Sequence, residues 1–428
     1  MSDWYLDFVD LNYKPAKDDL ICLFRIEPAK GITMKEAAGR VASESSVGTW
    51  TELYHLPKRI KSLMARAFEI KGNYIKVAYP IDLFELGNMP QILSSVAGNI
   101  FGMKAIRNIR LEDVHWPQKL IKSFKGPQFG IHGIRKILEI KKRPITITVV
   151  KPKLGLSSKE HAKIGYESWI GGIDLLKDDE NLSNQTFNRF EERVKESLKM
   201  RDKAEKKTGD RKSYLINITA ETKEMLKRAK FVADNGGEYV MVDIITAGWA
   251  GLQTVRNECE DLKLAIHAHR ASHASMTRSR HHGISMLTIA DVARLIGVDQ
   301  LHIGTVVGKL ESPKDEVIAL NLEIERQLIK KHGHVLSENW HGIKPVLAVC
   351  SGGLHPGLVS GLIKMLGNDI GIQCGGGVHG HPSGSRAGAA ALRQAIDATL
   401  DNISLKDYAK KHIELKGALN KWGYTKPR

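Results

Sequence analysis

The sequence has no long hydrophobic run: none approaches the ~18 apolar residues that a membrane-spanning helix needs. Its start, MSDWYLDFVD, is acidic and lacks the pattern of a signal peptide. Cysteine is scarce, and the four cysteines are scattered without a CxxC spacing. We therefore expect a cytoplasmic protein with reduced thiols and no membrane partner.

Acidic residues are too few to balance the basic ones. Lysine and arginine together number 64 and aspartate and glutamate 48, which gives a formal net charge of +16. Nucleic acid, phosphorylated small substrates or merely a basic proteome could each account for this excess. The basic residues are spread along the chain, with concentrations near Lys199–Lys212 and in the C-terminal tail, and they are not interleaved with aromatics. We therefore expect no nucleic-acid partner.

The 428 residues are enough for a small domain followed by a barrel of roughly 250 residues. Up to about residue 125 the pattern predicts an α+β domain. Its expected strands are Leu20–Ile26, Tyr74–Ala78 and Ile106–Val114, and its expected helices are Thr33–Ser46 and Pro90–Phe101.

From Pro144 onward, eight short apolar runs alternate with amphipathic segments, which favours a (β/α)₈ barrel over a doubly wound sheet. The runs are Ile145–Val150, Ile173–Leu176, Tyr214–Ile218, Tyr239–Ile244, Leu264–Ala268, Leu301–Ile303, Pro345–Val349 and Ile370–Gln373. The helical segments are Lys159–Trp169, Thr186–Lys207, Thr222–Asp234, Leu287–Leu295, Lys314–Lys330 and Ala387–Leu400. In such barrels the chemistry lies on the loops that follow the strands.

The second apolar run ends abruptly in Lys177-Asp-Asp-Glu180. Asp179 and Glu180 are hard oxygen ligands of the kind that Mg²⁺ prefers. Lys177 is the exception, because an ammonium is repelled by a dication. Reaction with CO₂ would remove that conflict, since a lysyl carbamate is an anionic oxygen ligand. The alternative is a charged, solvated turn between a strand and a helix.

Other strand ends carry polar or glycine-rich groups on the same side of the barrel. They are Lys151 and Lys153, His269 and Arg270, His302 with Lys309 beyond it, Ser351–Gly353, and Gln373–Gly377. Glycine-rich turns after the seventh and eighth strands are where barrel enzymes commonly bind phosphate. Taken singly, the lysine pair could be solvated, the His-x-His pair structural, and the glycines a tight turn. Their shared position favours a single functional site.

Together these motifs resemble the large subunit of ribulose-1,5-bisphosphate carboxylase/oxygenase (RuBisCO), most closely its archaeal form III or II/III branches. The resemblance rests on ESSVGTW at 44–50, GNIFG at 98–102, KPKLGL at 151–156, GGIDLLKDDEN at 171–181, HAHRASH at 267–273, HIGTVVGKLE at 302–311, Ser351–Gly353 and GGGVHGHP at 375–382. Ile303 stands where plant-type members usually have alanine or serine. The expected fold is α/β: a C-terminal (β/α)₈ TIM barrel (126–428) with a helical extension, and a smaller N-terminal α+β, ferredoxin-like domain (1–125).

The resemblance implies a carboxylase that adds CO₂ and water to ribulose 1,5-bisphosphate and releases two 3-phosphoglycerates. It implies that Lys177, as a carbamate, binds Mg²⁺ with Asp179 and Glu180. Lys151, beside a second cation at Lys153, should have a depressed pKa and transfer protons. His269 would assist proton transfer, and Lys309 would stabilise the new carboxylate.

The resemblance also implies a substrate site shared between two subunits. The implied substrate-binding residues are Glu44, Thr49, Trp50, Asn99, Lys153, Arg270, His302, Ser351, Gly352, Gly353, Gln373, Cys374, Gly375 and Gly376. The first four would come from the neighbouring subunit, so we expect a homodimer or an oligomer of dimers, without a small subunit. O₂ would compete with CO₂, and the pathway would be AMP or nucleoside salvage. A RuBisCO-like enolase or isomerase of sulphur salvage is the alternative function.

Overall fold

A computed structural model describes residues 4–55, 57–307 and 313–424 of the chain. The chain divides into two compact units. The first comprises Met1–Gly126, Ser272–Ile296 and Arg326–Ile343, and the second Pro127–Ala271, Gly297–Glu325 and Lys344–Arg428. Two segments from the later part of the chain thus group with the N-terminal part. The predicted division at residue 125 assigned both segments to the barrel domain.

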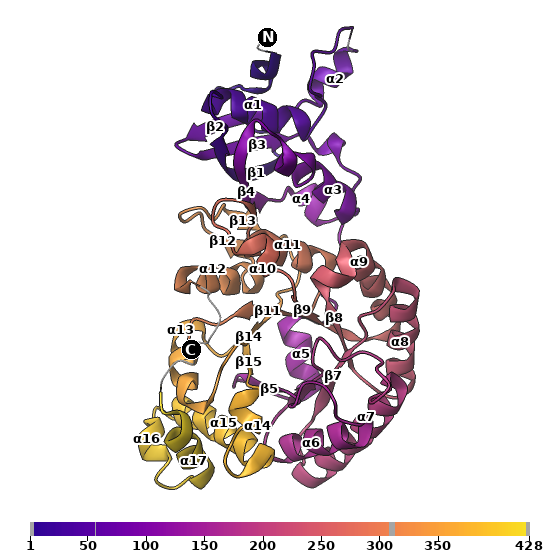
Figure 1. Ribbon diagram of the computed structural model, residues 1–428, viewed down its shortest axis with the longest axis vertical. Helices are drawn as coiled ribbons and strands as arrows, with labels where there is room; N and C mark the ends of the chain where they lie inside the picture. Colours follow the sequence, from indigo (N-terminus) through magenta and orange to yellow (C-terminus); the bar gives the residue numbers. More distant parts are fainter. Residues whose placement is uncertain (1–3, 56, 308–312, 425–428) are drawn as a thin grey trace. The chain divides into compact units, whose positions relative to one another are not determined.

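The first unit contains a five-stranded sheet in the order β10-β4-β1-β3-β2. Its strands are β1 (Leu20–Pro28), β2 (Arg66–Lys71), β3 (Tyr74–Tyr79), β4 (Ile106–His115) and β10 (Gly283–Ile284). The helices α1 (Met34–Glu44) and α3 (Met89–Val96) belong to this unit (Figure 1). The three strands expected here are present. The edge strand β2 was missed, because only Ala67 of its RAFEIK sequence is buried and the alternation is therefore weak.

The second unit is a closed barrel of eight parallel strands, which confirms the predicted α/β fold (Figure 1). Its strands are β5 (Ile145–Val149), β6 (Leu175–Lys177), β7 (Ser213–Asn217), β8 (Tyr239–Asp243), β9 (Ala265–His269), β11 (Gln300–Gly304), β14 (Leu347–Cys350) and β15 (Ile370–Gln373). Each of the eight apolar runs forms one of them. The parallel arrangement brings all eight carboxyl ends to one rim.

The connections between barrel strands are largely helical. They include α6 (Ser158–Ile170), α7 (Phe190–Thr208), α8 (Thr222–Asp234), α9 (Ile244–Leu262), α12 (Lys314–Glu325) and α13 (Val359–Leu366). The last strand is followed by α15 (Gly384–Leu400), α16 (Leu405–Tyr408) and α17 (Ile413–Trp422). The expected helix Leu287–Leu295 is α11 (Met286–Ile296), which groups with the first unit. The expected helix Lys314–Lys330 is shorter than predicted, because Leu328–Ile329 forms strand β12 paired with β13 (Glu338–Asn339). The helix α9 was not predicted, and Gly248, at φ 78°, interrupts it.

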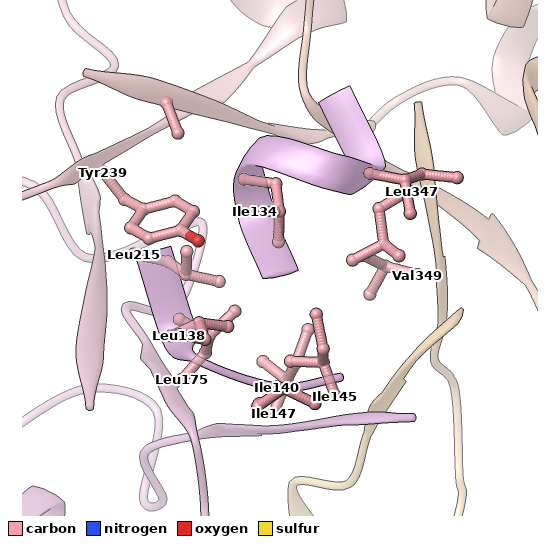
Figure 2. Packing of buried hydrophobic residues seen from close by; sticks show 12 residues of the cluster. Ile134, Leu138, Ile140, Ile145, Ile147, Leu175, Leu215, Tyr239, Leu347 and Val349 are labelled. Atoms are coloured by element: carbon pink, nitrogen blue, oxygen red, sulfur yellow. The ribbon is translucent and has the colours of Figure 1, made fainter. Parts of the chain in front are cut away.

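Helix α5 (Gly130–Leu138) closes the amino-terminal end of the barrel. Its Ile134 and Leu138 are buried and pack with residues near the starts of the strands, among them Ile145, Leu175 and Leu347 (Figure 2). Burying side chains of this size is worth about 1.5–3 kcal/mol each. Because apolar packing fills this end, the opposite rim is where a polar site can form. No helix among the described residues is long and apolar enough to cross a bilayer.

Candidate active site

Lys177 ends the three-residue strand β6 and is buried inside the barrel wall. It pairs in register with Val149 on β5 and Leu215 on β7, and its side chain has no solvent exposure. Its Nζ donates to the backbone carbonyl of Asp178 at 2.8 Å and lies 3.3 Å from Oε2 of Glu180. A solvated turn would expose this lysine, so that alternative is wrong.

Asp179 and Glu180, the second and third of the three carboxylates after β6, lie against cations. Asp179 Oδ2 accepts a hydrogen bond of 2.8 Å from Lys151 Nζ. Burial by itself would raise the pKa of Asp179, but hydrogen bonds from Lys151 and Asn181 hold it below its usual value. Burial likewise opposes ionisation of Glu180, while the charges of Lys177 and His269 lower its pKa. Both side chains are therefore anionic at neutral pH.

This donor set fits a magnesium ion if Lys177 supplies oxygen. No group of three His, Cys, Asp or Glu side chains able to hold a metal occurs in the described part of the chain. Asp179 and Glu180 provide hard oxygen donors of the kind Mg²⁺ takes. Because Lys177 Nζ already lies 3.3 Å from Glu180, a carbamate on that nitrogen would add an anionic oxygen beside the carboxylates.

His269, at the end of β9, lies between two acidic side chains. Its Nε2 is 3.6 Å from Glu180 Oε2, and its Nδ1 is 3.5 Å from Asp243 Oδ1. Asp243 also accepts a hydrogen bond of 2.7 Å from the backbone N–H of Ala271, which follows β9. Burial would raise the pKa of Asp243, but its contacts with His269 lower it. Asp243 was missed from the sequence, although an acidic residue ending the apolar run YVMVD was the available signal.

His302, on β11, contacts two side chains that hold both of its ring nitrogens. Its Nε2 is 2.9 Å from Nε2 of His267, and its Nδ1 is 2.7 Å from Ser351 Oγ. Burial and the neighbouring histidines lower the pKa of His302 well below its usual value. The ring is therefore neutral at physiological pH and can act as a hydrogen-bond donor or acceptor, but not as a cation.

Arg270 is a buried cation at the same rim. Burial lowers its pKa to about 10, so the guanidinium still carries a full charge at neutral pH. Within the described part of the chain no carboxylate lies within ion-pair distance of Arg270. The charge of Glu316 acts on Arg270 from beyond ion-pair distance and offsets only part of the effect of burial. A buried cation of this kind suits an anionic ligand.

A cavity of about 490 Å³ opens at the carboxyl ends of the strands. Its volume falls in the range of sites for small molecules. Its lining includes Lys151, Asp179, Glu180, His269, Ser351, Gly352, Gly353, Gln373, Gly375 and Gly376, all of which were predicted from the sequence. Gly377, which belongs to the predicted glycine-rich turn, lines it too, and so do Val149, Leu354, His355 and Trp422, which were not predicted.

Glycine is required at two places in this lining. Gly352 and Gly353 have φ of 113° and 78°, a conformation that other residues rarely adopt. A Cβ on Gly375 would lie 2.9 Å from Val149 Cγ1, too close for an unmoved side chain. The glycines therefore let backbone approach the cavity closely, as an anion site requires.

Several predicted residues are not among those that line this cavity. Lys153 is exposed, and Cys374 is fully buried, with burial raising the pKa of its thiol. Glu44, Thr49, Trp50 and Asn99 lie in the first unit, where the Trp50 side chain is 82% exposed. Lys309 lies outside the described residues.

Fold and site together define a (β/α)₈-barrel protein with lysines, carboxylates and histidines gathered at the carboxyl ends of its strands. Residues 130–422 match the family described as ribulose bisphosphate carboxylase large chain, catalytic domain, and residues 7–120 match the N-terminal domain of the same chain. This chain belongs to the RuBisCO large-chain family, which confirms the resemblance inferred from its motifs.

Archaeal relatives match along the full chain. The ribulose bisphosphate carboxylase of Pyrococcus abyssi is 54% identical over 100% of this chain and 98% of its own. That of Methanosarcina mazei is 49% identical over 97% and 99%. The dimeric archaeal Rubisco from Hyperthermus butylicus superposes with a TM-score of 0.94 at 50% identity, covering 99% of this chain and 100% of the other. An octameric Rubisco from Pyrococcus horikoshii gives 0.92 at 53%, covering 99% and 98%.

Proposed function

We propose that this chain is a ribulose bisphosphate carboxylase that converts D-ribulose 1,5-bisphosphate, CO₂ and water into two 3-phosphoglycerates. The observation that carries the proposal is the convergence of Lys151, Lys177, Asp179, Glu180 and His269 at one rim of the barrel. The names of its full-length archaeal relatives support the same activity.

Lys177 is proposed to react with CO₂ before turnover. The Lys177 ammonium first loses a proton to solvent. The neutral amine then forms an N–C bond with CO₂ and releases a second proton to solvent, so that a cation becomes an anionic oxygen donor. With Asp179 and Glu180 this donor would hold Mg²⁺. When bound, the metal supplies Lewis acidity toward the carbonyl and hydroxyl oxygens of the sugar.

Proton transfer is assigned to groups on either side of the carboxylates. We assign Lys151, on the loop after β5, to protonation of the final three-carbon carbanion, since its ammonium faces the cavity. His269 accepts and returns protons at the C3 hydroxyl. Its Nε2 lies 3.6 Å from Glu180 Oε2 and its Nδ1 lies 3.5 Å from Asp243 Oδ1, so a carboxylate on each side holds the ring in place.

The two phosphates of the substrate need two anion sites. Arg270 supplies the charge of the first. His302 is assigned to the same site and would exchange its contact with His267 or Ser351 for one with the phosphate. Gly353, Gly375 and Gly376 supply backbone N–H groups for the second, in a lining that also includes Ser351, Gly352 and Gln373. Lys153 is assigned to contact the substrate, and Lys309 to stabilise the carboxylate as it forms.

The active assembly is proposed to be a homodimer or an oligomer of dimers. Glu44, Thr49, Trp50 and Asn99 would complete the site of the neighbouring subunit. The exposure of Trp50, at 82%, is unusual for a tryptophan and suits a residue that is covered on assembly. Relatives described as dimeric and octameric support this arrangement. Competing oxygenation, a cytoplasmic location and a role in AMP or nucleoside salvage complete the proposal.

Incubation with Mg²⁺, labelled bicarbonate and ribulose 1,5-bisphosphate tests the function directly. A carboxylase yields labelled 3-phosphoglycerate. An enolase or isomerase of the alternative type would leave the label in bicarbonate, and that outcome would overturn the proposal.

A further inference from the structure

The side chain of Asp178 is fully buried in a polar cluster formed with His161, Arg193 and Tyr214. The Tyr214 hydroxyl donates to Oδ1 in a short hydrogen bond, and His161 Nε2 lies 3.3 Å from the same oxygen. Arg193 Nε lies 3.3 Å from Oδ2. None of the four side chains is more than 2% exposed.

This cluster, called here the Asp178 cluster, is anchored to three elements of the barrel. His161 belongs to α6, Arg193 to α7 and Tyr214 to β7. Arg193 also donates to the backbone carbonyls of Ser183 and Asn188, at 2.9 and 3.2 Å. Its charge balances that of the Asp178 carboxylate, so the buried cluster combines an ion pair with several further hydrogen bonds.

The backbone of the same residue reaches the proposed ligands. The Asp178 carbonyl accepts the 2.8 Å hydrogen bond from Lys177 Nζ, and the Asp178 N–H donates to Leu215 O at 3.1 Å. Asn217 links the two sides: its backbone N–H donates to Asp178 Oδ2 at 3.0 Å, and its side-chain amide donates to Glu180 O at 3.2 Å. The segment from Lys177 to Glu180 is thus held at several atoms beyond the end of the short strand β6.

We propose that Asp178 is a positioning residue whose buried cluster sets the orientation of the Lys177 amine for reaction with CO₂. The inference rests on the proposed carbamate at Lys177. The Asp178 peptide stands between Lys177 and Asp179, so any rotation of it moves the acceptor of the amine and the neighbouring carboxylate together. A site whose donors are fixed in advance loses less conformational entropy on reaction.

If the cluster only stabilised the fold, a different experimental result would be expected. In that case, loss of one of its hydrogen bonds lowers the unfolding temperature but leaves carbamate formation unchanged in the folded protein. Replacing Asp178 itself would leave Arg193 as a buried, unpaired charge and could prevent folding. Tyr214→Phe is the better probe, because it removes one hydroxyl and keeps the ring.

Tyr239→Phe is the matched control. Tyr239 is also fully buried in a barrel strand, β8, and its hydroxyl has no hydrogen-bond partner among the residues that the structure describes. Carbamate formation is followed by NMR with isotopically labelled CO₂ and Mg²⁺ added, at a temperature where all variants are folded. We expect the CO₂ concentration for half-maximal signal to rise about tenfold in Tyr214→Phe, the size expected from a lost hydrogen bond to a charged group, and to stay unchanged in Tyr239→Phe.

The outcomes separate the inference from the proposed function. No carbamate signal in the unmodified protein would overturn the proposed function. A normal signal there, with an equal half-maximal concentration in Tyr214→Phe, would overturn the positioning role, and so would equal shifts in both tyrosine variants. If Tyr214→Phe does not fold, His161→Leu removes another contact to the same carboxylate oxygen and should shift the concentration in the same direction.

Discussion

Lys151 Nζ lies 2.8 Å from Asp179 Oδ2, and Lys177 Nζ lies 3.3 Å from Glu180 Oε2. Each carboxylate proposed to hold Mg²⁺ is therefore paired with a lysine from the same site. In the proposed function, reaction with CO₂ would convert the second lysine into a ligand, whereas the first would compete with the metal for Asp179. On the sequence alone, Lys153, a second cation, is the expected charged neighbour of Lys151. In the structure, Lys151 Nζ instead contacts the carboxylate of Asp179.

The first prediction follows from that competition. Lys151→Met keeps the length of the side chain and removes the charge, so Mg²⁺ should bind the CO₂-treated protein about tenfold more tightly. Titration calorimetry measures the affinity. Lys153→Met is the control, because this exposed lysine has no ion pair in the described part of the chain and its loss should leave the affinity unchanged. Weaker metal binding by Lys151→Met would contradict the competition.

The second prediction concerns activation. Activity should rise after preincubation with CO₂ and Mg²⁺ together, and Lys177→Ala should eliminate turnover while the barrel stays folded. Lys212→Ala is a matched control, because Lys212 is equally buried but pairs with Asp210 beside β7. Time courses with and without preincubation measure the effect, and full activity in Lys177→Ala would refute the carbamate.

The third prediction concerns the sharing of sites between subunits. If Glu44 serves the neighbour's site, mixing inactive Glu44→Gln and Lys177→Ala subunits should restore some activity. In a mixed dimer both lesions fall in one site and the other site is intact. Subunit exchange is verified by mass spectrometry. Absence of recovery after complete exchange would show that each subunit builds its own site.

The fourth prediction concerns the ion pair at the start of β6. Asp174 is buried and accepts two hydrogen bonds from Arg143, of 2.6 and 2.7 Å. Burial opposes its ionisation, yet Arg143 lowers the pKa of Asp174 below its usual value. Asp174→Asn should cost about 3 kcal/mol of unfolding free energy at pH 7, because the Arg143 charge loses its partner.

The pH dependence of that cost has a definite sign. A carboxyl whose pKa is lowered by folding contributes stability that is present above its unfolded pKa of 3.8 and is lost as the pH falls through the folded value. The difference between the two proteins should therefore be constant near neutrality and shrink below about pH 4. Asp369→Asn is the control: its partner is Arg135, but the Asp369 side chain is 50% exposed, so it should cost less than about 1 kcal/mol. Denaturant unfolding at several pH values measures both.

Much of the fold was predictable because barrel strands are short, apolar and separated by regular intervals. The position of Lys177 at a strand end, and of Ser351–Gly353 and Gly375–Gly377 at two others, followed from the same pattern. The sequence could not reveal which distant residues meet. Tyr214 and Asp178 are 36 positions apart, and His267 and His302 are 35 apart, so their contacts depend on the closure of the barrel. Helix α13 was missed for another reason: its eight residues form too short a segment to show a helical period.

The fifth prediction separates carboxylation from enolisation. Lys309 lies outside the described residues, and its assignment rests on the HIGTVVGKLE motif. In the proposed function, enolisation would need the metal, the carbamate and bound phosphates, whereas Lys309 would be needed mainly once negative charge develops on the incoming carboxylate. Removing one such preorganised donor typically costs a factor of about 10² to 10³.

Lys309→Ala should therefore still exchange the C3 proton of ribulose 1,5-bisphosphate with solvent while carboxylating it extremely slowly. Exchange is measured at saturating substrate, because the same lysine is assigned a phosphate contact. Lys314→Ala, an exposed lysine at the start of α12, serves as the control and should change neither rate. Equal losses of exchange and carboxylation in Lys309→Ala would assign Lys309 to binding or enolisation. Nearly intact carboxylation would remove it from the chemistry altogether.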